Sequence, residues 1–236
     1  MPTTAPERSA DLALLDHFMW NALSGPLAHI SVGGASVRKL APGFSPIVAF
    51  ADPGQPDFAA LAELCAPDEP FYVENWRGAG PAGWRIEAEA TMVKMYFAGE
   101  IPTEDDFPQA IALGAEHAPQ MLELALLMRP GPFGLRTVEM GDYFGVIEGG
   151  ELVAMAGERL RAGSLREISG VATRPGHQGR GLARRLMAKL VRRQLARGEQ
   201  PVLHVMSANA VARALYTRQG WREHREVPVR VVVREA

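Results

Sequence analysis

The residues with the clearest chemical potential lie within VATRPGHQGRGLARRLMAKL, residues 171–190. Gly179 and Gly181 flank Arg180 where a short apolar run gives way to a helical pattern. A glycine loop that starts a helix presents unpaired backbone N–H groups at the positive end of the helix dipole. Glycine has no Cβ to hold a ligand away from the backbone, and arginine adds a cation. The stretch therefore predicts a phosphate-binding helix N-terminus.

Two common phosphate-binding motifs do not fit this loop. A nucleotide P-loop needs a Lys-Ser/Thr pair after its last glycine, where this chain has Leu182 and Ala183. A dinucleotide fingerprint has glycine or alanine at the position of Arg184 and an acidic residue at the end of the next strand. Glu199 instead comes directly after the helical pattern. The residues exclude both motifs.

A third motif fits. The run Gln178–Gly179–Arg180–Gly181–Leu182–Ala183 resembles the Gln/Arg-x-x-Gly-x-Gly/Ala signature of the GNAT superfamily, the acetyl-CoA-dependent N-acetyltransferases. The run Asn209–Ala210–Val211–Ala212–Arg213–Ala214–Leu215–Tyr216 matches the Asn-x-x-Ala-x-x-Leu-Tyr pattern of that family, and Gly220–Trp221 stands where Gly-Phe usually follows. The resemblance covers about residues 105–236. The whole chain is somewhat similar to glycine-N-acyltransferase-like members, which also place extra sequence before this domain.

The resemblance implies a binding site for acetyl-CoA. Its pyrophosphate would contact the amides of Gln178, Gly179, Arg180, Gly181, Leu182 and Ala183. Its pantetheine would lie along the strand that contains Val171, Ala172 and Thr173, which in this family splays from its parallel neighbour, here 202–206. Asn209 would contact the pantetheine, and the amide near Val171 would stabilise the oxyanion.

Two residues are candidates for proton transfer. Tyr216 is the candidate general acid, since a tyrosine of ordinary pKa, about 10, is protonated at neutral pH. Glu167 is the candidate base, eleven residues before Gln178, and strand parity places it on one face with Ser169, Val171 and Thr173. The alternative is that Glu167 pairs with a nearby arginine. His204 is predicted to be a core histidine with satisfied hydrogen bonds, and the alternative is that it acts as a base.

Hydrophobic periodicity predicts the fold class. We expect strands at 45–52, 71–75, 84–92, 109–114, 143–148, 151–160, 165–173, 202–206 and 221–233, and helices at 57–66, 117–128, 181–198 and 209–219. From residue 109 the order is β-α-β-β-β-α-β-α-β, which predicts an α/β (α+β) fold with a mixed, mostly antiparallel sheet flanked by helices. Acidic, proline-containing residues 98–108 form the candidate linker between an N-terminal α/β region, 1–100, and the acetyltransferase domain, 105–236. The first region would be a degenerate copy of the domain or a lid.

The net charge of −2 hides an asymmetry, because residues 1–157 carry −13 and residues 158–236 carry +11. An acidic half favours a cationic acceptor, so we expect a small-molecule amine or a peptide N-terminus. The basic residues follow an amphipathic helix without interleaved aromatic residues, which argues against nucleic acid. A homodimer is compatible with the sequence.

Further classes are excluded by composition. No run approaches the roughly 18 apolar residues of a membrane span. The single cysteine, Cys65, suits a reducing compartment, and no Cys/His cluster has metal-ligand spacing. The sequence predicts a cytoplasmic protein with no membrane insertion and no metal.

These observations converge on one reaction. We expect an N-acetyltransferase that moves an acetyl group from acetyl-CoA to a primary amine by direct attack, with no covalent enzyme intermediate. The alternative is a non-catalytic acyl-CoA-binding sensor.

Overall fold

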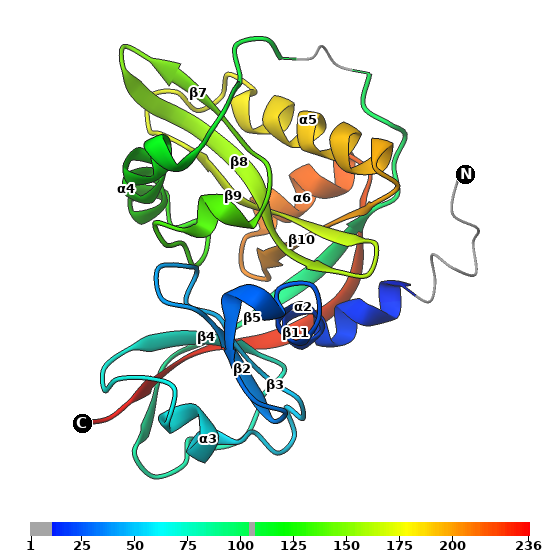
Figure 1. The fold of residues 1–236 in the computed structure, drawn as a ribbon. Helices are drawn as coiled ribbons and strands as arrows, with labels where there is room; N and C mark the ends of the chain where they lie inside the picture. Colours follow the sequence, from blue (N-terminus) through cyan, green and yellow to red (C-terminus); the bar gives the residue numbers. More distant parts are fainter. Residues whose placement is uncertain (1–10, 104–106) are drawn as a thin grey trace.

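An eight-stranded sheet forms the centre of the protein in a computed structural model that describes residues 11–103 and 107–236 (Figure 1). The strand order is β4-β11-β5-β10-β9-β8-β7-β6, and only β9 and β10 pair in parallel among the described strands. The strands are β4 (Pro70–Glu74), β5 (Trp84–Phe97), β6 (Ile111–Ala112), β7 (Tyr143–Glu148), β8 (Glu151–Ala162), β9 (Leu165–Thr173), β10 (Gln200–Met206) and β11 (Trp221–Arg234). The mixed, mostly antiparallel sheet flanked by helices agrees with the predicted fold class.

Helices cover both faces of this sheet. The apolar faces of α5 (Leu182–Ala196) and α6 (Ala210–Arg218) pack on one side, and α2 (Phe18–Ser24) and α4 (Ala118–Met128) pack on the other. Figure 1 shows α5 and α6 together and α4 on the opposite edge of the view. Short 3₁₀ helices occupy Ala13–His17, Ala28–Ile30, Ala115–His117 and Thr137–Met140. No helix of the described chain is long and apolar enough to cross a membrane.

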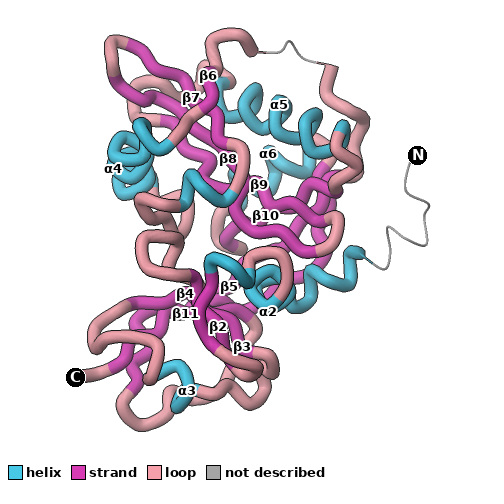
Figure 2. The backbone as a smooth tube through the Cα atoms, in the orientation of Figure 1, coloured by secondary structure: helices cyan, strands magenta, loops and turns pink. Residues whose placement is uncertain are grey.

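The N-terminal segment adds a second, smaller sheet. Strands β1 (Ser31–Gly33), β2 (Val37–Leu40) and β3 (Val48–Phe50) form it, and α3 (Phe58–Ala62) packs beside it (Figure 2). In the large sheet, β5 lies between β10 and β11, so residues before position 100 and after position 105 share that sheet. Of the expected linker, residues 104–106 lie outside the described residues. The division into two domains stays a prediction.

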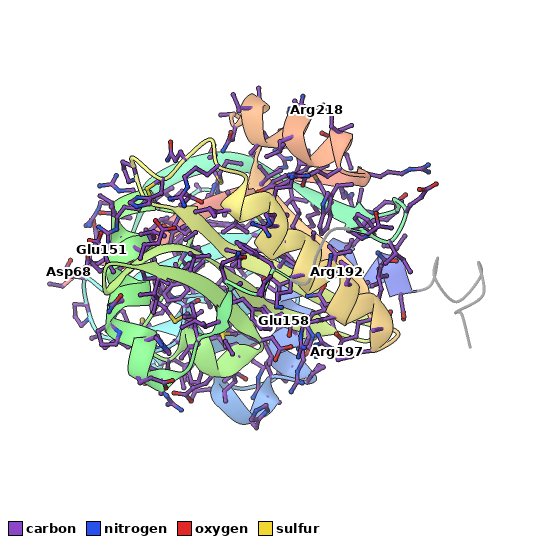
Figure 3. The ribbon with its side chains drawn as sticks, turned by 90° about the horizontal axis from the view of Figure 1, so that it is seen from above. Asp68, Glu151, Glu158, Arg192, Arg197 and Arg218 are labelled. Carbon is purple, nitrogen blue, oxygen red and sulfur yellow. The ribbon has the colours of Figure 1, made fainter. Side chains whose placement is uncertain are left out.

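Local sequence signals explain the elements near the site. The Asn209 side chain caps α6 by accepting a hydrogen bond from the Ala212 amide at 3.0 Å. At the far end of α5, Arg197 forms an ion pair with the buried Glu158 (Figure 3). This pair links the C-terminal end of α5 to β8.

The predicted order of elements after residue 109 is confirmed, but several predicted lengths along the chain differ, and the strand predicted at 45–52 is only β3, Val48–Phe50. Strand β5 continues beyond residue 92 to Phe97 because Val93, Met95 and Phe97 alternate into the core. The strand predicted at 109–114 is only Ile111–Ala112, and α3 is only Phe58–Ala62. In each short element, local periodicity extended the prediction beyond the residues that find pairing or packing partners.

Candidate functional site

The site begins where the parallel strands β9 and β10 separate. They pair over Leu165–Glu167 and Gln200–Val202, and in the described chain they make no ladder pair beyond those residues. A cavity of about 470 Å³ occupies the gap. Tyr216 and Ala212 of α6 line it from one face of the sheet, and His204 and Met19 line it from the other. The gap therefore connects the two faces of the sheet.

A β-bulge shapes the wall of the gap on β9. Gly170 has φ +63°, and three steps on β9 from Ser169 to Ala172 oppose two steps on β8. As a result, Val171 packs with Ile168 on the α5 side, whereas Ala172 packs with α4. The prediction that strand parity places Glu167 on one face with Val171 and Thr173 is therefore wrong. Glu167 and Ser169 lie on the opposite face from Val171 and Thr173.

The loop before α5 leaves its backbone donors free. In the described chain, no hydrogen bond of good geometry is donated by the amides of residues 178–183, although Gln178 and Gly179 lie in a turn. Gly179 and Gly181 have φ +77° and +74°, which favour glycine, and a Cβ built at Gly179 would meet no described atom within 4 Å. The loop is thus an open cradle of N–H groups at a helix N-terminus, and a phosphate fits it.

The side chains of this loop are less free than its backbone. Arg180 donates two hydrogen bonds to Glu148 at 2.7 and 2.9 Å. These bonds lower the pKa of Glu148 and raise that of Arg180. Gln178 donates from Nε2 to the carbonyl of Thr173 at 3.2 Å. Arg180 therefore lies at the rim as a cation already paired with a carboxylate.

Tyr216 lies on α6 in the wall of the cavity, as does Asn209 at the start of that helix. The Tyr216 hydroxyl has no hydrogen-bond partner in the described part of the chain. Burial raises the pKa of Tyr216 above its ordinary value. The hydroxyl is thus protonated at neutral pH and free to donate a proton into the cavity.

Glu167 is buried and strongly held. Arg159 donates to both of its carboxylate oxygens, at 2.7 and 3.0 Å, and the Leu160 amide donates at 3.1 Å. Burial alone would raise the pKa of Glu167, but the charge of Arg159 and the contact with His204 outweigh it and hold this pKa well below its ordinary value. The alternative in which Glu167 pairs with an arginine describes these contacts, and Glu167 does not itself line the cavity.

The prediction that His204 is a satisfied core histidine is wrong. Its Nδ1 lies 2.7 Å from Oε1 of Glu167, but its Nε2 is buried and has no hydrogen-bond partner among the described residues. The ring lines the cavity. Sequence reasoning weighed His204 as a base and favoured the core role, because the contact joins two strands whose register it did not assign. The signal that could have found it is a lone polar residue within the apolar strand VLHVM.

The charge of the cavity walls also differs from expectation. Its ionisable residues are Glu89, Arg129, Arg159, His204 and Arg230, among which the arginines outnumber the single carboxylate. The expected acidic wall for a cationic amine is therefore not found. Apolar and aromatic side chains also line the cavity, among them Met19, Tyr72, Met92, Met128 and Val229. Among the described residues, no group of His, Cys, Asp and Glu could hold a metal ion.

The site combines two parallel strands that separate, a loop of amides before α5, and Tyr216 on α6. These features are typical of an acyltransferase of the N-acetyltransferase fold. The family model for FR47-like proteins matches residues 143–231. A GNAT-family protein from Novosphingobium aromaticivorans is 36% identical, with a TM-score of 0.84 over 94% of this chain and 99% of that one. This chain belongs to the GNAT family.

More distant structures share the fold alone. A GCN5-related N-acetyltransferase from Kribbella flavida is 16% identical, with a TM-score of 0.56 over 96% of each chain. A GCN5-related N-acetyltransferase-like protein from Streptococcus suis is 14% identical, with a TM-score of 0.55 over 96% of this chain and 99% of that one. A search of curated proteins found no match. The two structures span almost the whole chain, so the N-terminal residues are part of the shared architecture.

Proposed function

We propose that this acyltransferase moves an acetyl group from acetyl-CoA to a primary amine by direct attack. The observation that carries the proposal is the gap between β9 and β10, which opens beside the free amides of residues 178–183. A donor bound along one face and an acceptor bound at the other would meet in this gap. Alignment of two bound reactants can by itself supply a large part of the rate enhancement.

The chain offers a binding group for each part of the donor. Amides of Gln178, Gly179, Arg180, Gly181, Leu182 and Ala183 would hold the diphosphate. The edge of β9 at Val171, Ala172 and Thr173 is unpaired toward β10 and would bind the pantetheine amides, as a strand binds an added strand. The Nδ2 group of Asn209 would add a contact, because only its Oδ1 is used by the helix cap. When bound, acetyl-CoA supplies an acetyl thioester.

Tyr216 is the proposed general acid. Its hydroxyl is protonated at neutral pH and has no competing partner among the described residues. It would donate its proton to the departing sulfur, and solvent would then reprotonate the phenolate. An amide near Val171 would donate to the carbonyl oxygen as negative charge develops on it.

The acceptor is proposed to be a small-molecule amine or a peptide N-terminus that carries an apolar group. The methionine and tyrosine side chains that line the cavity support an acceptor with an apolar group, because burying apolar surface contributes about 25 cal/mol per Å². The arginines of the cavity do not favour a polycationic amine. A peptide N-terminus fits only if its first side chain enters this apolar region.

Two linked measurements test this function. Acetyl-CoA at about 100 times its Kd should stabilise the protein by about 2.7 kcal/mol, which corresponds to a Tm rise of roughly 5–10 °C. Release of free thiol should then follow the addition of benzylamine or an alanyl peptide and be weaker with spermidine. An unchanged Tm at millimolar acetyl-CoA refutes the proposal. A raised Tm without thiol release for any amine identifies a non-catalytic acyl-CoA sensor instead.

A further inference from the structure

An amine acceptor is mostly an ammonium ion at neutral pH, so a protein group must accept a proton before or during attack. We propose that Nε2 of His204 is this acceptor and that Glu167 acts as the positioning residue behind it. The inference rests on the proposed amine acetylation and assigns the base of that reaction. It differs from the sequence-based hypothesis, in which Glu167 takes the proton itself.

The position of His204 is fixed from two sides. Its Nδ1 lies 2.7 Å from Oε1 of Glu167, and its ring packs against Phe18 of α2 with centroids 5.6 Å apart. Glu167 cannot move to another partner without losing Arg159, which binds both of its oxygens. The imidazole is therefore held in one orientation by a carboxylate that is itself held by an arginine.

This arrangement selects the tautomer of the neutral ring. An ionised carboxylate only accepts hydrogen bonds, so the 2.7 Å contact requires the hydrogen on Nδ1 of His204. Nε2 then carries a lone pair. Because this atom is buried and has no partner among the described residues, its lone pair is available to a ligand in the cavity that His204 lines. A carboxylate that orients a histidine in this way also stabilises the imidazolium formed on proton uptake.

The charges around His204 are balanced in pairs. Glu167 on β9 is paired with Arg159 on β8. Lys94 lies directly across from His204 on β5 and pairs with Glu74 of β4 at 2.8 Å. Arg159 and Lys94 thus each have their own carboxylate, and proton uptake on His204 adds one positive charge next to Glu167. Arg129, which also lines the cavity, has no carboxylate partner among the described residues.

The proton and electron count closes with the chain's own groups and water. The amine nitrogen forms a bond to the acetyl carbon, and the C–S bond breaks with its electron pair on sulfur. An ammonium substrate loses two protons from nitrogen: the first passes to Nε2 of His204 before attack, and the second passes to water as the amide forms. One proton passes from the Tyr216 hydroxyl to the sulfur. Water then removes the proton from His204 and restores the one on Tyr216. No oxidant, reductant or metal is required.

His204→Asn is the sharpest variant, because the asparagine amide nitrogen replaces Nδ1 as a donor to Glu167 and nothing replaces Nε2. We expect kcat/KM for benzylamine or an alanyl peptide to fall at least 100-fold at pH 7, with unchanged affinity for acetyl-CoA and an unchanged Tm.

His224→Asn is the matched control. His224 also contacts a carboxylate, Asp16, at 3.1 Å, but it lies outside the lining of the cavity. Its variant should keep the wild-type kcat/KM. If His204→Asn keeps more than half of the wild-type kcat/KM, the assignment is overturned.

A second readout needs no activity. Nitrogen NMR of histidine-labelled wild-type protein above pH 8 should show His204 with a protonated Nδ1 and an unprotonated Nε2. A protonated Nε2 in the neutral ring contradicts the proposal. Failure of the proposed function is a different result, namely no thiol release by the wild type with any amine, and the tautomer then still decides whether His204 is built to accept a proton.

Discussion

Two buried carboxylates of the same sheet, Glu74 and Glu167, have similar partners and different surroundings. Glu74 lies 2.8 Å from the Lys94 ammonium and accepts a hydrogen bond from the Met19 amide at 3.0 Å. Lys94 in turn donates to the Leu15 carbonyl. All partners in this set are groups of the protein itself, and they link the start of α2 and the turn before it to the sheet.

Glu167 has the same kinds of partner, a cation and a backbone amide, but its cation is Arg159, and it has one more partner. That partner is His204, whose second nitrogen is unsatisfied at the cavity wall. Burial and ion pairing alone therefore do not distinguish a structural carboxylate from one that serves a reaction. Each set has a buried atom without a hydrogen bond, but Oε2 of Glu74 lies 2.8 Å from the Lys94 ammonium, whereas Nε2 of His204 belongs to a residue that lines the cavity. This position at the cavity is the distinguishing feature.

The largest expected effects come from breaking either buried set. Glu74→Ala and Glu167→Ala should each lower the free energy of unfolding by about 3–5 kcal/mol, because each leaves a buried cation unpaired. Urea unfolding followed by fluorescence measures this. A loss below about 1 kcal/mol in either variant would show that the freed cation finds water or another partner.

Double variants sharpen the comparison. Glu74→Leu combined with Lys94→Met should recover most of the lost stability, because apolar residues of similar volume can replace a buried ion pair. The same treatment of Glu167 and Arg159 should recover stability and leave the acetylation rate low. Recovery of the rate in that second pair would contradict a role for Glu167 in positioning His204.

The next largest expected effect is the loss of the stability that Glu167 and its partners contribute when the pH is lowered. Its folded-state pKa lies below the ordinary value, so the unfolded chain binds the proton more tightly. The stabilisation is fully present above about pH 4.5 and is lost as the pH falls toward the folded-state pKa. In Glu167→Gln the free energy of unfolding should depend less steeply on pH between about pH 5 and 2 than in the wild type. If the free energy of unfolding depends on pH equally steeply in the wild type and in Glu167→Gln, Glu167 is not ionised in the folded protein.

Tyr216→Phe should have an intermediate effect, which falls on kcat. We expect a decrease of about 100-fold, equal to about 2.7 kcal/mol, with acetyl-CoA affinity unchanged. Stopped assays of thiol release and calorimetric titration with acetyl-CoA separate the two quantities. A loss of cofactor affinity with normal kcat would assign Tyr216 to binding alone.

The smallest expected effect concerns the amide cradle. Gly179→Ala should cost about 1 kcal/mol of stability, because an L-residue at φ +77° is strained, and should also weaken acetyl-CoA binding. Gly198→Ala is the control, since Gly198 has φ +74° and equally open surroundings at the other end of α5. Its variant should lose similar stability and bind acetyl-CoA normally. Equal binding losses in both would place the ligand elsewhere.

The parts of the site that sequence could predict are those with local causes. The glycine loop, the asparagine cap and the 3.6-residue periodicity place α5 and α6 to within one or two residues. The amides of residues 178–183 follow from that placement. The glycine at position 170 was also a local signal, because a glycine inside a strand often marks a bulge, and counting parity through it gave the wrong face.

The contact between Glu167 and His204 has no local cause. It joins residues 37 apart in sequence, and it exists because Glu167 pairs with Val202 in the parallel register, two residues before His204. Arg159 enters the set only through the antiparallel pairing of β8 with β9. Registers of this kind depend on the packing of the whole sheet, so the base remained ambiguous until the structure defined them.

The most direct test of the account is an NMR titration of the labelled protein with coenzyme A. The account predicts that the largest amide shifts fall on residues 178–183 and 171–173, with small shifts at the hairpin glycines Gly149 and Gly150. Shifts concentrated elsewhere, or none at saturating coenzyme A, would contradict the assignment of this gap and loop as the donor site.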